Sequence, residues 1–259
     1  MNFNRIYAII LRYLYAEPIL NRIFKISYWN ILNIVIWGTT SKWIQTQTNN
    51  PELGLIILTG LAFWQIVFRV NIETAKNLSQ ELNDKNLVNL FSSPLNLSEW
   101  ICAISILNLI ETILVILIGS ILIKITYSIN IMKLGWIVIP STILLWISGL
   151  FIGFLICSIL IRAGKRVQDL IYSLGYIFAP FSAIYYPAYM MPEWVKYISI
   201  FLPTTYVFEN IRYIISNGQS NFNLIIKSLM LNIIYLTLSI IIFNFMFKSS
   251  KARGLLSLE

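Results

Sequence analysis

Long apolar stretches separated by short polar breaks run along almost the whole chain. A helix needs about 20 mostly apolar residues to cross the hydrocarbon of a bilayer, and six stretches approach or reach that length. The runs are continuous and do not alternate with period two, which favours helices over a membrane barrel. The pattern predicts an all-α polytopic membrane protein, a single transmembrane domain over residues 1–259, with six transmembrane helices near Tyr28–Ile44, Leu53–Ile72, Glu99–Ile123, Leu134–Ile161, Leu170–Tyr186 and Leu224–Phe247.

Composition supports a membrane location, and the basic residues predict an orientation. The chain is 58% hydrophobic and only 12% charged, whereas a soluble fold of this size needs a more polar surface. Basic residues are retained on the cytoplasmic side of a bilayer, so we expect both termini in the cytoplasm and account for the net charge of +8 by topology. There is no long basic run, and nucleic acid is not an expected partner. The basic flanks before the first span and after the fourth and sixth are Arg5, Arg12, Arg22, Lys25, Arg162, Lys165, Arg166, Lys248, Lys251 and Arg253.

The side chains needed for most enzyme chemistry are scarce. The chain has no histidine, its only aspartates are Asp84 and Asp169, and Cys102 and Cys157 both fall in apolar stretches. These residues give little basis for a catalytic cluster, a metal site or a disulfide framework. No GxxxxGK[ST] loop is present for binding nucleotide phosphates. We therefore expect a non-enzymatic chain that binds no cofactor itself.

Residues 1–25 predict an amphipathic helix at the membrane surface. Arg5 and Arg12 fall on one narrow face, and the apolar residues occupy the rest. Such a helix lies in the headgroup region with its arginines toward phosphate and its apolar face in the acyl boundary. Pro18 should end it before the first span. A poorly ordered basic tail is the alternative.

The break between the second and third spans, residues 73–98, predicts a short amphipathic helix in the cytosol. Its leucines recur at helical spacing, and Glu81, Asp84, Lys85 and Asn86 cover another face. We expect Glu81 and Asp84 to face the cytosol. A helix of this kind docks in a groove of a soluble partner, with leucines as anchors and charges setting the register. The alternative is a helix that only caps the bundle.

Residues 187–216, on the predicted outer side, contain two apolar segments that are too short to span. Met191–Phe201 and Thr205–Ile215 are separated and flanked by prolines. Short re-entrant helices fit this pattern if protein covers them. A kink is also expected at Pro180, within the fifth predicted span.

Two polar side chains inside the third span are candidates for function. Glu111 lies about midway along it, where an ionised carboxylate is costly, and Asn108 is one turn earlier on the same face. They would contact a substrate or a partner across a dimer seam, or they would fix helix packing, the interpretation we favour. On the fourth span Gly149, Gly153 and Cys157 form a small-residue stripe for close helix approach.

The chain resembles the type 2 ABC transporter permeases of bacterial export systems over nearly its whole length. The Ser-Pro-Leu element before the third span and the Leu-Pro, Tyr, Phe-Glu and Arg spacing near the outer surface are the more specific features. The stretches that carry the resemblance are RIYAIILRYLY at 5–15, the Trp37–Gly38 pair, ELNDKNLVNLFSSPLNLSEW at 81–100 and FAPFSAIYYPAYMMPEWVKYISIFLPTTYVFENIR at 178–212.

The resemblance implies half of an export pathway in the bacterial cytoplasmic membrane. This chain would pair with a second copy of itself and with two copies of a separate ATPase, which binds ATP and Mg²⁺. Glu81, Asp84, Lys85 and Asn86 would belong to the coupling helix, Arg5 and Arg12 to the interfacial helix beside it, and Glu209 and Arg212 to the outer re-entrant region. The cargo would be a lipid, a drug or a lipid-linked saccharide. An ion-coupled secondary transporter without an ATPase partner is the alternative function.

Overall fold

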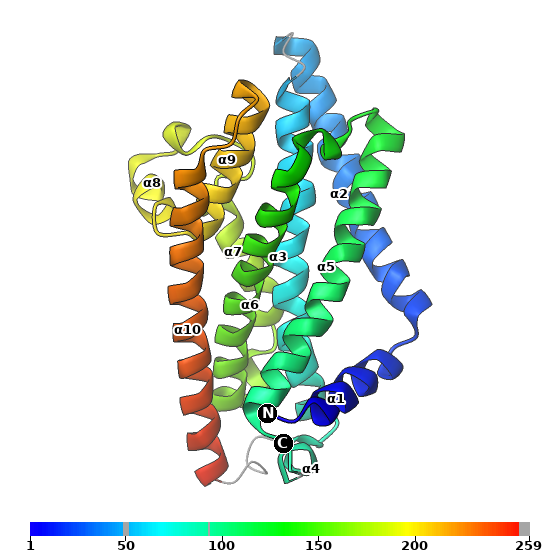
Figure 1. The fold of residues 1–259 in the computed structure, drawn as a ribbon, viewed down its shortest axis with the longest axis vertical. Helices are drawn as coiled ribbons and strands as arrows, with labels where there is room; N and C mark the ends of the chain where they lie inside the picture. The colour runs from blue at the N-terminus through cyan, green and yellow to red at the C-terminus, as the bar shows by residue number, and fades with distance from the viewer. Residues whose placement is uncertain (49–51, 93, 254–259) are drawn as a thin grey trace.

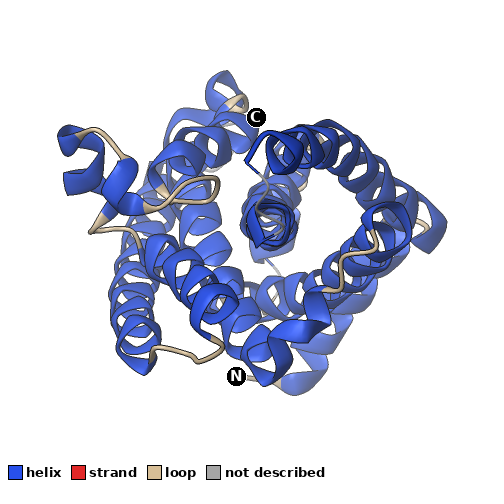
Figure 2. Cartoon of the chain, turned by 90° about the horizontal axis from the view of Figure 1, so that it is seen from above, coloured by secondary structure: helices blue, strands red, loops and turns tan. Residues whose placement is uncertain are grey.

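The computed structural model describes residues 1–48, 52–92 and 94–253, and in these ranges it contains helices and loops but no strand (Figures 1 and 2). The all-α prediction is therefore confirmed. The α-helices are α1 (Phe3–Ala16), α2 (Ile19–Thr48), α3 (Glu52–Asn83), α4 (Leu87–Ser92), α5 (Leu97–Tyr127), α6 (Val138–Ala163), α7 (Leu170–Phe178), α8 (Glu193–Ser199), α9 (Pro203–Asn217) and α10 (Phe222–Arg253), with short 3₁₀ segments η1 (Ile131–Ile137), η2 (Gly164–Val167), η3 (Ala179–Phe181) and η4 (Ala188–Met190).

Within the described ranges, four segments are long and apolar enough to cross a bilayer, which makes the chain a multi-pass membrane protein. They are Glu52–Asn83, Leu97–Tyr127, Leu134–Val167 and Phe222–Lys251. The prediction of six spans is not confirmed. Helix α2 has the length, but charged and amide side chains lower its hydropathy. The apolar segment Leu170–Phe181 is a shorter helix that gives way to a 3₁₀ turn beside Pro180.

Helices α1 and α2 meet at an elbow around Pro18. Helix α1 ends at Ala16, Glu17 is extended, and α2 begins at Ile19. Proline cannot donate the backbone hydrogen bond that would continue α1, so the expected break occurs where predicted. The predicted interfacial segment of 1–25 is thus two elements, because residues 19–25 already form the first turns of α2.

Helix α1 packs on the protein through the face that we expected to enter lipid. Ile6, Ile9 and Tyr13 are buried in the main hydrophobic core, mainly beside α5. Phe3 and Tyr15 are exposed and remain available to lipid. Helix α1 is therefore attached to the bundle by its own apolar stripe.

Helix α3 runs without a break from the apolar region to Asn83, eleven residues past the predicted end of the second span. Lys85, at a left-handed φ of 52°, lies in the turn that leads to α4. Residues 73–98 therefore contain the end of a long helix, a turn and the six-residue α4, and not one separate amphipathic helix. Leu78, Leu82 and Leu87 are completely buried in the core, so within one chain they cap the bundle.

The small-residue stripe on α6 packs directly against α3. A Cβ on Gly149 would lie 2.6 Å from the Val70 side chain, and one on Gly153 would lie 2.6 Å from Thr74. The Cys157 thiol lies 3.6 Å from the Thr74 carbonyl oxygen. These contacts confirm the packing role, which depends on glycine because no larger residue fits.

The two ends of the bundle differ in their elements (Figure 1). Helix α1, the α3–α4 turn and the end of α10 lie at one end, and α8 and α9 lie toward the other. Gln168, just after η2, donates hydrogen bonds to Ser79 and Asn83 near the end of α3. The three basic flanks of the sequence therefore gather at the α1 end.

Candidate functional site

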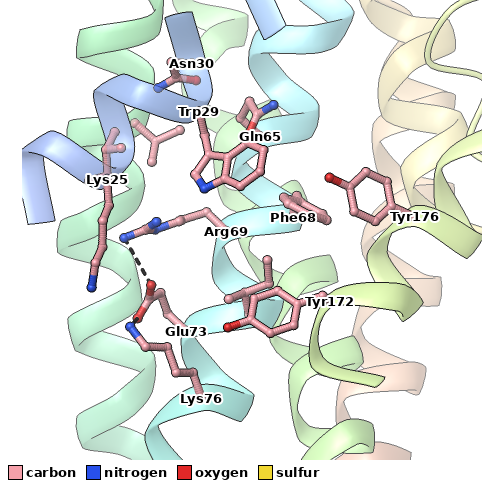
Figure 3. Close-up of a pocket in the computed structure, with 13 residues that line it drawn as sticks. Lys25, Trp29, Asn30, Gln65, Phe68, Arg69, Glu73, Lys76, Tyr172 and Tyr176 are labelled. Atoms are coloured by element: carbon pink, nitrogen blue, oxygen red, sulfur yellow. Dashed lines mark ion pairs between the residues drawn. The ribbon is translucent and has the colours of Figure 1, made fainter. Parts of the chain in front are cut away.

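A cavity of about 520 Å³ opens between α2, α3 and α7, with α5 behind it. Its edge is accessible, because Tyr172 and Tyr176 are both more than half exposed. Figure 3 shows Arg69 reaching across the cavity between Trp29 and Glu73. We name it the aromatic cavity, and its lining residues are Lys25, Ile26, Trp29, Asn30, Gln65, Phe68, Arg69, Ile72, Glu73, Lys76, Val115, Tyr172 and Tyr176.

A second cavity of about 640 Å³ adjoins it toward the α1 end. The two share Lys25, Glu73, Lys76 and Tyr172 among their lining residues. The second, which we name the polar cavity, is also lined by amides and hydroxyls of α2, α3 and the η2–α7 junction, including Asn77, Gln80, Asn83 and Gln168. Together the cavities form one path that is apolar and aromatic in one half and polar in the other.

Charged side chains form a chain of ion pairs along this path. Arg69 Nη2 lies 3.1 Å from Glu73 Oε1, and Arg69 Nε lies 3.7 Å from Glu111 Oε2. Lys76 Nζ lies 3.7 Å from Glu73 and 3.8 Å from Glu17. Distances near 4 Å mark loose pairs that are weaker than a direct hydrogen bond. The lysine contacts are therefore open to competition from another anion.

Glu111 connects the cavity to the elbow. Its Oε1 atom lies 2.6 Å from Nη1 of Arg22, and the same guanidinium also donates to the Tyr13 carbonyl oxygen at the end of α1. Asn108 lies on the same helix but has a different partner, because its amide donates to Thr74 Oγ1 at 2.7 Å. The structure thus separates two residues that the sequence had grouped: Asn108 contacts the packed α3–α5 interface, and Glu111 contacts two arginines.

Arg69 retains unused hydrogen-bonding capacity. Its Nε and Nη2 atoms are buried, yet among the described residues neither finds an acceptor with hydrogen-bond geometry, and the same holds for Glu111 Oε2. Buried donors without partners are rare in folded proteins, because each carries a desolvation cost. The guanidinium is thus a strong donor group at the wall of an accessible cavity.

Glu17 lies in the elbow and is held as a carboxylate. Its partial burial by itself raises its pKa, but the bond from Lys25 and the charge of Lys76 outweigh this, and the net pKa lies below the ordinary glutamate value. The contribution of these contacts to stability is present above the ordinary pKa and is lost as pH falls through the lowered one. The elbow is therefore charged throughout the neutral range.

The predicted coupling residues occupy different environments. Glu81 is only 3% exposed, which corrects the expectation that it faces the cytosol. Its carboxylate accepts bonds from Arg12 at 2.8 Å, from the Tyr13 hydroxyl at 2.9 Å and from the Asn86 amide at 2.6 Å. Burial and the Glu81 charge raise the pKa of Tyr13, which stays a donor. Glu81 and Asn86 thus attach α1 to the end of α3.

Asp84 and Lys85 remain exposed at the turn after α3. Arg5 donates to the Pro94 carbonyl oxygen and lies 3.7 Å from Glu99, so both arginines of α1 contact groups of the protein. From the sequence we had expected both arginines to point toward lipid phosphate. Asp84 and Lys85 therefore form an exposed turn at the α1 end, and α1 contacts the last turn of α3 before it through Glu81.

Glu209 and Arg212 form a pair near the opposite end. Glu209 Oε1 accepts a bond from Arg212 Nη1 at 2.8 Å and from the Ala188 backbone amide at 2.7 Å. This arrangement ties η4 to α9. The Nε and Nη2 atoms of Arg212 are buried without hydrogen-bond acceptors among the described residues.

Sequence reasoning missed the main charged residues of the cavity. Arg69, Glu73 and Lys76 are spaced to share one helix face, and Arg69 lies inside the predicted second span. A basic residue within an apolar span indicates a functional site, and this signal was available in the sequence. Glu73, Glu81 and Glu99 are buried as well as Glu111.

Known proteins give no independent guide to this site. No protein-family model matches the chain, and no curated protein is similar enough to count as a match. The resemblance to type 2 ABC permeases therefore depends on the quoted sequence stretches alone.

Proposed function

We propose that this chain is the permease subunit of an ATP-driven exporter in the bacterial cytoplasmic membrane, with both termini in the cytoplasm. It would act as a homodimer with two copies of a separate ATPase subunit, which binds ATP and Mg²⁺. The cargo would be a lipid, a drug or a lipid-linked saccharide. The chain itself would catalyse no reaction.

The observation that carries the proposal is the construction of the α1 end. The exposed turn at Asp84 and Lys85 stands at the tip of the unbroken α3, and α1 braces that helix through Glu81. A partner that pushes on such a tip moves a long helix, whereas a flexible loop would absorb the motion. The same helix lines the aromatic cavity, so α3 joins the proposed docking surface to a path for cargo.

Purification of the complex from its native membrane tests the proposal. Intact mass should show two copies of this chain with two copies of a soluble ATPase. The double variant Asp84→Lys with Lys85→Glu should lose the ATPase while its thermal stability stays parental, because both side chains are exposed. Lys42→Glu, exposed near the far end of α2, is the matched control. A chain that transports alone without ATP would refute the proposal.

An ion-coupled secondary transporter remains the second candidate, and one observation favours it. Glu73 and Glu111 are buried carboxylates beside an accessible cavity, where such transporters hold their coupling groups. Both carboxylates contact arginines or lysines, which lowers their capacity to take up another cation. Transport abolished by a protonophore and indifferent to ATP would favour this candidate.

A further inference from the structure

We propose that the aromatic cavity binds amphiphiles with an anionic headgroup, a phosphate or a carboxylate, and discriminates against cationic ones. The inference rests on the proposed function and assigns the class of cargo. The headgroup would bind Arg69 and Lys76, and the apolar tail would lie against the aromatic side chains. This proposal narrows the cargo to the anionic members of the broader group of lipids, drugs and lipid-linked saccharides.

Charge is the first argument. Of the described residues that line the aromatic cavity, Lys25, Arg69 and Lys76 are basic, and Glu73 alone is acidic. Glu73 lies between two of these cations, at 3.1 and 3.7 Å, so it is not free to attract a cationic ligand. Glu17 contacts Lys25 and Lys76, and Glu111 lies between Arg69 and Arg22. With these groups included, four cations face three carboxylates, so the region keeps a net positive charge that favours an anion over a cation.

The unused donors of Arg69 are the second argument. Nε and Nη2 are buried. They lie 3.7 Å from Glu111 and 3.1 Å from Glu73, but among the described residues neither has an acceptor with hydrogen-bond geometry. A guanidinium presents its donors in a planar fork that matches two oxygens of a phosphate or a carboxylate. An anionic headgroup would supply both acceptors at once, which a neutral sugar hydroxyl or an amine cannot do with comparable strength.

The distribution of polarity is the third argument. Trp29, Phe68, Tyr172 and Tyr176 surround Arg69 on the apolar side (Figure 3). Lys76 lies at the boundary with the polar cavity, since it lines both. The polar cavity continues with amide side chains and with the carboxylates of Glu17, Asp84 and Asp169, which suit a hydrated, uncharged group attached to the headgroup. An amphiphile fits this order of surfaces, with its charge at the boundary and its tail among the rings.

Quenching of tryptophan fluorescence by tail-brominated probes tests the assignment on the full-length chain in phosphatidylcholine nanodiscs. The probes are 12-bromododecyl phosphate and 12-bromododecyl trimethylammonium, which share a tail and differ in charge. The phosphate probe should quench the tryptophan fluorescence in a saturable manner, and the Trp29→Phe variant should lack the saturable part of this quenching. The cationic probe should bind at least about tenfold more weakly, because a lost charge-assisted contact corresponds to about tenfold or more in affinity.

Variants identify the headgroup contacts. Arg69→Gln and Lys76→Gln should each weaken binding of the phosphate probe about tenfold, and Lys124→Gln, exposed near the far end of α5, should leave it unchanged. Arg69 also pairs with Glu73 and Glu111, so if its variant does not fold, the partly exposed Lys76 decides the test. Competition with inorganic phosphate distinguishes a site for amphiphiles from a site for free phosphate. Inorganic phosphate should displace the probe only at a far higher concentration than that of the probe.

Three results would overturn the proposal: equal binding of both probes, no effect of either variant, or competition by inorganic phosphate at the concentration of the probe. The assay contains neither ATP nor an ATPase. Failure to bind would therefore overturn the cargo class alone, and failure to recover an ATPase complex would overturn the proposed function alone.

Discussion

Removal of the Glu81 carboxylate should detach α1 from the bundle. The side chain is almost fully buried and accepts hydrogen bonds from Tyr13 and Asn86 as well as from Arg12. In Glu81→Ala the buried Tyr13 hydroxyl and the partly buried Asn86 amide lose their acceptor. The loss is about 1–3 kcal/mol for the hydroxyl and near the lower end of that range for the amide. The Arg12 contact adds less than about 1 kcal/mol, because its side chain is 41% exposed. We expect a total loss of about 3–5 kcal/mol.

The loss should appear first as local opening of α1, which packs at the edge of the bundle. Hydrogen exchange over residues 3–16 should speed up by roughly a hundredfold or more, and SDS titration in mixed micelles should report any remaining global loss. Asp84→Ala removes an exposed carboxylate three residues away and should stay within about 0.5 kcal/mol of the parent. Equal exchange rates and equal stability of the two variants would refute the conclusion that Glu81 attaches α1 to the bundle.

Tyr13 provides an independent check on the same cluster. Its hydroxyl donates to Glu81 and accepts from the Trp100 indole nitrogen at 3.1 Å, and Trp100 is fully buried. Tyr13→Phe should therefore cost about 1–3 kcal/mol. Combined with Glu81→Ala it should cost less than the sum, with a coupling of about 0.5–3 kcal/mol. Strict additivity would contradict a direct interaction.

Two further predictions concern packing and topology. Gly153→Ala should destabilise the bundle by about 1–3 kcal/mol in thermal unfolding, since its Cβ would lie 2.6 Å from Thr74. Gly119→Ala is the control, because its Cβ would meet its nearest neighbour at 4.0 Å. Equal losses of stability in the two variants would contradict the close α3–α6 contact. Single cysteines at Lys196 and Lys165 should react with an impermeant maleimide from outside and from inside respectively, and the reverse pattern would overturn the proposed orientation.

The elements that sequence patterns predicted well are those set by local chemistry. Pro18 breaks the first helix because it lacks a backbone donor, and Pro180 marks the change from α7 to a 3₁₀ turn. Gly153 could be assigned to a helix contact because small residues at intervals of four permit close approach. The all-helical fold followed from continuous apolar runs.

The partners of charged residues could not be predicted in the same way. Glu81 looked exposed because its neighbours in sequence are polar, but Arg12 and Tyr13, nearly 70 positions away, cover it. Arg22 looked like a flank of the first span, yet it pairs with Glu111, 89 residues later. Periodicity identifies one face of one helix. Which second helix covers that face depends on tertiary packing.

The continuity of α3 gives the molecule a stiff lever. Between Arg69 and Asn83 the helix contains neither proline nor glycine, the residues at which helices most often bend. Glu73 at the cavity and Glu81 at the braced end are eight residues apart, or roughly 12 Å along the axis. A force applied at the tip therefore reaches the cavity as a rigid displacement of its wall. Arg69, Glu73 and Lys76 would shift together relative to Glu111 and Glu17, so ion pairs between helices would change while those within α3 stay intact.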